Sequence, residues 1–186
     1  MTDITVLGIS GSLRAGSFNT ALLRAARQLA PAGMTVELYE GLRDIPPYDG
    51  DTDTETPPEP VADLRRRISQ ADGVLFVTPE YNYSVPGVLK NAIDWASRPA
   101  GHSSLTHKPV AIMGASPGNF GAVRAQLALR QSFVWINARM VVQPEVMVFK
   151  AGERFDEHGT LTDTTTAALV RKLLDALATT IHTPAP

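Results

Sequence analysis

Short, nearly continuous apolar runs alternate along this chain with segments in which apolar residues recur at every third or fourth position. A continuous apolar run is typical of a strand that is covered on both faces, as in a parallel sheet. The first such run is ITVLGI at residues 4–9. We expect four further strands, at residues 35–39, 73–79, 108–116 and within 140–149.

The segments between these runs predict helices. The first carries apolar residues at helical spacing, and we expect Asn19 to cap its start and Pro31 and Gly33 to mark its end. Further helices are expected at residues 61–71, 86–97, 122–136 and about 166–181. The proline-rich residues 40–60 form a loop of a length that is typical of functional or interface segments.

Strands that alternate with helices predict an α/β fold, here a five-stranded parallel sheet with helices on both faces. A length of 186 residues with 44% hydrophobic residues suits a single domain over residues 1–186. In such folds ligands bind beyond the carboxyl ends of the strands. Three polar or glycine-rich loops fall at that edge, at residues 10–19, 79–86 and 115–121.

The first loop has the parts of a phosphate site. Its glycines free backbone N–H groups, and a helix N-terminus follows. Ser10, Ser12 and Ser17 add hydroxyls. Arg14 adds a guanidinium that can clamp a phosphate. Because Ser17 stands where a P-loop has its lysine, and the pattern G-x-G-x-x-G is absent, a terminal phosphomonoester fits better than a pyrophosphate. The alternative is a helix cap with an ordinary turn.

The other two loops favour a flat ligand. The second, TPEYNYSVPG, places Tyr81 and Tyr83 just after a buried strand, where an aromatic side chain beside backbone amides can border a planar ring. The third, GASPGNFG, has glycines that allow a ligand to approach the backbone closely. Taken alone, the tyrosines also fit packing residues with solvated hydroxyls, and the third loop also fits a flexible turn.

The third loop raises one alternative function. GASPG matches the G-x-S-x-G pattern of serine hydrolases, with Ser116 as the nucleophile. Asp156 or Asp163 and His158 or His182 follow in the required order. The oxyanion hole of such a site needs the backbone N–H of the residue after the serine, and that residue is a proline, which has none. The proline after Ser116 therefore argues against a serine hydrolase.

Composition excludes several function classes. A net charge of −2 favours neither nucleic acid nor an anionic membrane, so neither partner is expected. The absence of cysteine excludes disulfides, thiol catalysis and thiolate metal sites, and the four histidines lack metal-ligand spacing. No apolar run approaches the ~18 residues of a membrane helix, and no signal peptide precedes the first strand, so we expect a cytoplasmic protein.

Two long motifs carry a family resemblance. GSLRAGSFN together with TPEYNYSVPGVLKNAIDW closely resembles the NADPH-dependent FMN reductase family, which includes quinone, azo-dye and chromate reductases. The resemblance implies a flavodoxin-like three-layer sandwich, with FMN and NADPH (or NADH) as cofactors. The family commonly has adjacent glycines near the end of the third loop, whereas here Gly121 is followed by Ala122.

The resemblance also assigns site residues by position. The first loop would hold the FMN phosphate, the second would border the isoalloxazine ring, and the third would contact the flavin. Together with Ser10 from the first loop, the residues expected to bind the cofactor are Ser12, Leu13, Arg14, Ala15, Gly16, Ser17, Phe18, Asn19, Pro79, Glu80, Tyr81, Asn82 and Ser116.

The implied function is an FMN-dependent NAD(P)H oxidoreductase. Hydride would pass from NAD(P)H through FMN to a small acceptor (a quinone, an azo compound, a metal oxyanion or free flavin) by ping-pong kinetics. No side chain is then needed as an acid or base, so no catalytic residue is assigned. The family implies a homodimer or homotetramer. The main alternative is a non-enzymatic electron carrier in the manner of flavodoxin.

Overall fold

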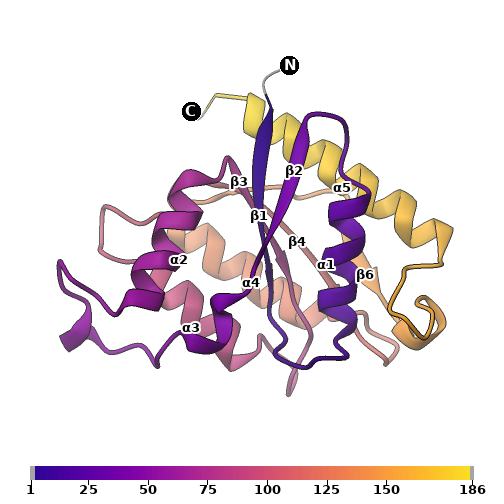
Figure 1. The fold of residues 1–186 in the computed structure, drawn as a ribbon, viewed down its shortest axis with the longest axis horizontal. Coiled ribbons are helices and arrows are strands. Elements are labelled where there is room, and N and C mark those ends of the chain that lie inside the picture. Colours follow the sequence, from indigo (N-terminus) through magenta and orange to yellow (C-terminus); the bar gives the residue numbers. More distant parts are fainter. Residues whose placement is uncertain (1–2, 185–186) are drawn as a thin grey trace.

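A computed structural model describes residues 3–184, and these form a twisted parallel sheet between two layers of helices (Figure 1). The path through the sheet is β2-β1-β3-β4-β5, and β6 also pairs with β4. All pairings are parallel. The strands are β1 (Ile4–Ser10), β2 (Met34–Tyr39), β3 (Gly73–Val77), β4 (Pro109–Ala115), β5 (Arg139–Met140) and β6 (Val146–Val148). The expected flavodoxin-like α/β sandwich is confirmed.

The edge of the sheet differs from the prediction of a single fifth strand within residues 140–149. Two short strands stand there instead, and both pair with β4, β5 beside Pro109 and β6 beside Met113. Pro144 lies between them. Because proline has no N–H to donate to the ladder, the edge strand is interrupted at this point.

Helices cover both faces of the sheet, as expected. Side chains of α1 (Phe18–Gln28) and α5 (Thr164–His182) pack with Val6, Leu75 and Met113 on one face. On the other face, α2 (Glu59–Gln70), α3 (Gly87–Ala96) and α4 (Val123–Ile136) pack with the alternate strand residues, such as Leu7 and Phe76. Every residue of β3 and β4 is buried, which explains their continuous apolar runs. Within residues 3–184, no helix has the length and apolarity needed to span a membrane.

The start of α1 corrects one prediction. Ser17, and not Asn19, caps this helix: its backbone is extended, and its Oγ accepts from the N–H groups of Asn19 (3.2 Å) and Thr20 (3.3 Å). Asn19 already lies inside the helix, and its side chain turns toward the end of β4. There its Nδ2 donates to the carbonyl of Ala115, and its Oδ1 accepts from the N–H of Ala115, both at 2.9 Å.

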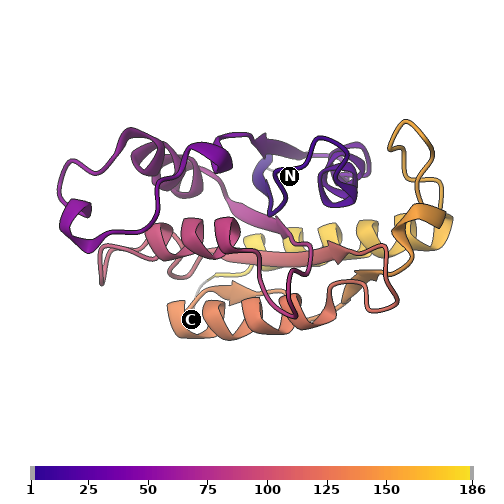
Figure 2. The same cartoon turned by 90° about the horizontal axis from the view of Figure 1, so that it is seen from below.

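The long segment between β2 and α2 is ordered against its own chain. It contains two short 3-10 helices, η1 (Gly41–Asp44) and η2 (Gly50–Thr52). The carbonyl of Pro46 accepts from Asn91 Nδ2 and Trp95 Nε1 of α3, both at 2.8 Å. Asp53 forms ion pairs with Arg65 and Arg98. Figure 2 shows this segment (purple) and the loop around residue 155 (orange) at opposite ends of the molecule.

Candidate functional site

The loops that follow β1, β3 and β4 meet at the carboxyl edge of the sheet, at the bottom of Figure 1. Together they enclose a cavity of about 200 Å³, which we call the front cavity. Its lining residues are Ser12, Arg14, Ser17, Phe18, Asn19, Pro79, Glu80, Tyr81, Ala115, Ser116 and Pro117. The topology thus brings together three segments that lie far apart in the sequence.

The first loop presents a run of free backbone donors. Among residues 3–184, no acceptor pairs with the backbone N–H groups of residues 12–17, which lead into the N-terminus of α1. Ser12 and Ser17 are buried at the two ends of this run, while Arg14 is exposed between them. Unpaired N–H groups, the positive end of a helix and a guanidinium all favour an anion. The loop therefore fits a phosphate.

The second loop forms a turn with left-handed backbone conformations beside the first loop. Asn82 and Tyr83 have φ of 48° and 70°, and the N–H groups of Tyr81 and Ser84 each donate to the other's carbonyl. The Tyr81 hydroxyl lies 3.4 Å from Ser12 Oγ, so the first two loops touch. Within the described residues, the backbone N–H groups of Glu80 and Asn82 have no acceptor.

Arg124, at the start of α4, joins the second loop to the third. The carboxylate of Glu80 accepts a hydrogen bond from the backbone N–H of Arg124 at 3.0 Å and another from the Arg124 guanidinium at 2.5 Å. The guanidinium carbon also lies 3.9 Å from the ring centroid of Tyr83 and 4.3 Å from that of Phe120. These contacts orient the Glu80 carboxylate toward α4, so a bound ring would meet the backbone of this residue.

The third loop has a backbone shape that suits close approach. Gly121 has φ of 54°, and a Cβ there would lie 2.8 Å from the carbonyl carbon of Met147. Ala122 follows with φ of 61° and is fully buried. Ala122 thus adopts the left-handed conformation that a second glycine takes easily. The N–H of Ser116 donates to the carbonyl of Val148, which fixes the loop against β6.

The hydrolase alternative finds no support in this geometry. Ser116 Oγ accepts from the N–H of Gly118 at 3.1 Å and, within residues 3–184, bonds to no histidine. Asp163 caps α5 by accepting from Thr166, and it also pairs with Arg154. Asp156 accepts from backbone N–H groups of its own loop. Hydrogen bonds from Thr166 and from the Thr160 backbone lower the pKa of Asp163 and Asp156, respectively. Both carboxylates are therefore engaged in local structure.

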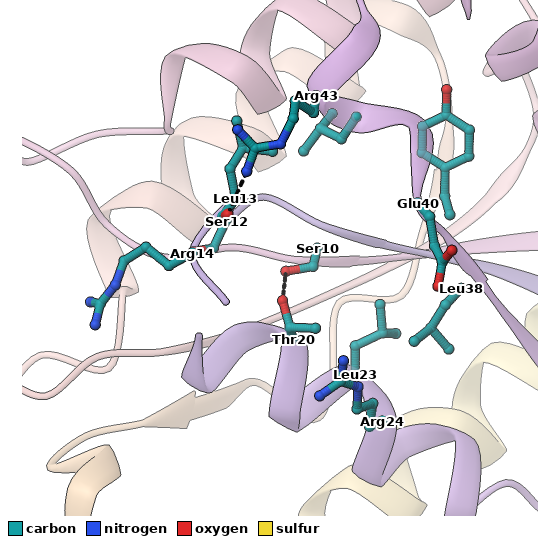
Figure 3. A pocket seen from close by; sticks show the side chains of 12 residues that line it. Ser10, Ser12, Leu13, Arg14, Thr20, Leu23, Arg24, Leu38, Glu40 and Arg43 are labelled. Atoms are coloured by element: carbon teal, nitrogen blue, oxygen red, sulfur yellow. Dashed lines mark hydrogen bonds between the residues drawn. The ribbon is translucent and has the colours of Figure 1, made fainter. Parts of the chain in front are cut away.

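The structure brings most of the expected cofactor residues into one cavity, but not all of them. Ser10 and Leu13 face a second cavity on the other side of the first loop (Figure 3). Ala15, Gly16 and Asn82 are exposed and do not line the front cavity. Sequence reasoning missed Arg124, because nothing in the sequence indicates a contact with a carboxylate 44 positions away. Among residues 3–184, no cluster of His, Asp and Glu side chains could hold a metal ion.

Comparison with known proteins identifies the family. The family model for NADPH-dependent FMN reductases matches residues 4–153. The chain is 49% identical over 175 residues to an NAD(P)H-dependent FMN reductase of Pseudomonas aeruginosa, with 94% of each chain covered. It is 43% identical over 161 residues to a quinone reductase of Pseudomonas putida, covering 87% of this chain and 86% of the relative.

A solved structure extends the likeness to three dimensions. The flavoenzyme NAD(P)H:(acceptor) oxidoreductase FerB of Paracoccus denitrificans superposes with a TM-score of 0.86 at 38% identity, covering 96% of this chain and 97% of FerB. The sequence match and the fold indicate the same family, and the first loop, with its unpaired N–H groups, is consistent with it. The chain belongs to the NADPH-dependent FMN reductase family and is an FMN-dependent NAD(P)H oxidoreductase.

Proposed function

We propose that the front cavity is the FMN site, with the phosphate at residues 12–17 and the flavin ring toward Tyr81 and the third loop. The observation that carries this assignment is the run of unpaired N–H groups ahead of α1, with Arg14 between them. The cavity holds the phosphate end, and the ring extends toward the exposed edge. Bound FMN supplies the chemistry, accepting hydride from NAD(P)H and returning electrons to an acceptor.

The protein's own contribution is to hold and orient the ring. Backbone N–H groups of Glu80 and Asn82 are free to stabilise negative charge on a reduced ring, and they are held in place by the Glu80–Arg124 ion pair. Tyr81 is 44% exposed and borders the region where substrates would arrive. No acid or base is required from the protein under this proposal.

The substrates we propose are NAD(P)H and small electron acceptors. The relatives are named FMN reductase and quinone reductase, which supports quinones and free flavin as acceptors. Azo compounds and metal oxyanions are further acceptors of the same kind. If the nicotinamide and the acceptor use the open face of the same ring in turn, ping-pong kinetics follow. The cytoplasm, where NAD(P)H is available, is the compartment we propose.

We further propose that the whole chain acts as one domain in a homodimer or homotetramer. The outer face of α4 exposes large apolar side chains, and Trp135 is 90% exposed. Leu127 and Val134 lie on the same face, and Val142 is exposed just beyond the helix. Clustered apolar residues of this size on a surface are typical of protein contacts. A second copy of the chain is the partner that family membership supports.

Titration with two flavins tests the FMN site. A charge-assisted hydrogen bond contributes ~1.5–3 kcal/mol, so Arg14→Ala should weaken FMN binding roughly 10- to 100-fold. Riboflavin, which lacks the phosphate, should bind the wild type and the variant alike. Arg27→Ala on the outer side of α1 serves as the charge-matched control. Equal losses of FMN and riboflavin affinity in Arg14→Ala would remove the phosphate assignment.

A further inference from the structure

A second cavity, of about 230 Å³, lies behind the first loop, and the proposed FMN site does not use it. It is formed by the first loop, α1, the end of β2 and η1 (Figure 3). We call it the back cavity. Ser12 and Arg14 line both cavities, so the first loop is their common wall.

The charged side chains that line the back cavity are mostly positive. In Figure 3, Arg43 from η1 and Arg24 from α1 lie on opposite sides of the Ser10–Thr20 pair, while Arg14 extends away from both. Within residues 3–184, neither Arg24 nor Arg43 forms an ion pair, and Glu40 is the one carboxylate in the lining. Arg43 donates one N–H to the carbonyl of Leu13 at 2.8 Å, and its other donors have no acceptor in the part of the chain that the structure describes.

The chemistry of the lining fits a phosphate attached to an apolar or aromatic group. Guanidinium groups match phosphate oxygens in pairs of hydrogen bonds. Between the two arginines, the hydroxyls of Ser10 and Thr20 lie 2.9 Å apart and offer a further donor. Leucine side chains from three elements, including Leu23 of α1, supply apolar walls. The cavity is smaller than the roughly 300–1,000 Å³ of a pocket that encloses a whole drug-sized ligand, so it suits one end of a larger molecule.

We propose that the back cavity binds the phosphomonoester at the adenosine end of NADPH, so that Arg24 and Arg43 determine the preference for NADPH over NADH. The proposal rests on the proposed function, because it places the nicotinamide end of the same molecule at the flavin across the shared loop. In dinucleotide-binding doubly wound folds, an arginine near the ribose accommodates the 2′-phosphate of NADP. Arg43 stands four residues beyond the end of β2.

Coenzyme kinetics of the FMN-loaded protein test this assignment. The ratio of kcat/KM for NADPH to kcat/KM for NADH should fall roughly 10- to 100-fold in Arg24→Gln and in Arg43→Gln, and further in the double variant. The fall should come from NADPH alone. Arg27→Gln, on α1 but outside the cavity, should keep the wild-type ratio. Equal losses for both coenzymes, or an unchanged ratio, would overturn the proposal.

Binding without turnover separates this proposal from the proposed function. Calorimetry should show that 2′-AMP binds the wild type more tightly than 5′-AMP does, and that the double variant loses this difference. FMN titration of Arg24→Gln should match the wild type, because Arg24, unlike Arg43, makes no hydrogen bond to the first loop within the described residues. If the wild type oxidised neither coenzyme, the proposed function would fail. The 2′-AMP measurement would still show whether the back cavity binds an adenosine 2′-phosphate. If inorganic phosphate alone stabilised the wild type and 2′-AMP bound no better, the cavity would be a free-phosphate site and the coenzyme assignment would be wrong.

Discussion

Asn19 gives the sharpest test of how the front cavity is held together. Its side chain makes two buried hydrogen bonds to the backbone of Ala115, each 2.9 Å long, and so ties the start of α1 to the end of β4. Asn19→Ala leaves both the N–H and the C=O of Ala115 without these partners. Each orphaned group costs about 1–3 kcal/mol, and because water can reach the pair from the front cavity, we expect a total loss of about 2–4 kcal/mol.

The assay is urea unfolding of the flavin-free protein, with Asn119→Ala, an exposed asparagine of the third loop, as the matched control. The control should stay within about 0.5 kcal/mol of the wild type. FMN binding should also weaken in Asn19→Ala, because the loops on two sides of the cavity lose their connection. If Asn19→Ala matched the wild type in flavin-free stability and lost only FMN affinity, Asn19 would be a ligand contact and not a structural tie.

The remaining predictions concern the third loop and α5. Ser116→Ala should retain NADPH oxidation at saturating FMN, since losing a neutral hydrogen bond costs ~0.5–1.5 kcal/mol of flavin affinity; abolished turnover would restore a chemical role for this serine. Gly121→Ala should destabilise the protein by about 1–3 kcal/mol, because Gly121 has a φ of 54° and an added Cβ would lie 2.8 Å from the backbone of β6. In the control Gly118→Ala the added Cβ makes only ordinary contacts, so this variant should keep the wild-type stability. Equal urea midpoints for the two variants would contradict the prediction. Hydrogen bonds from Thr166 lower the pKa of Asp163 in the folded state, so this carboxylate stabilises the fold above its unfolded pKa. The difference in Tm between wild type and Asp163→Ala should therefore shrink as pH falls below about 4, and a constant difference would rule out this contribution.

The sequence predicted the architecture because burial on both faces leaves a local pattern. The runs at β1, β3 and β4 are apolar almost throughout, since each strand packs against helices on two sides. Parallel strands then place every loop that follows a strand at the same edge. For that reason Ser12, Arg14 and Tyr81 could be expected in one site before any geometry was known.

Features that depend on distant contacts could not be predicted in this way. Ser17 and Asn19 are both good capping residues, and only the packing of α1 against β4 decides that Ser17 caps the helix while Asn19 turns inward. The Glu80–Arg124 pair joins residues whose proximity depends on the sheet order. The back cavity could not be predicted for the same reason, because Arg24 and Arg43 line one cavity only when α1 and η1 fold beside the first loop.

Reduction of the bound flavin tests the central claim most directly. The FMN-loaded protein would be mixed without oxygen with one equivalent of NADPH, and a quinone would be added after the visible flavin absorbance has been recorded. We predict that NADPH alone bleaches this absorbance, that the quinone restores it, and that double-reciprocal plots against NADPH at several quinone concentrations are parallel. A flavin absorbance that NADPH leaves unchanged in the absence of quinone, with intersecting plots in steady state, would contradict the account.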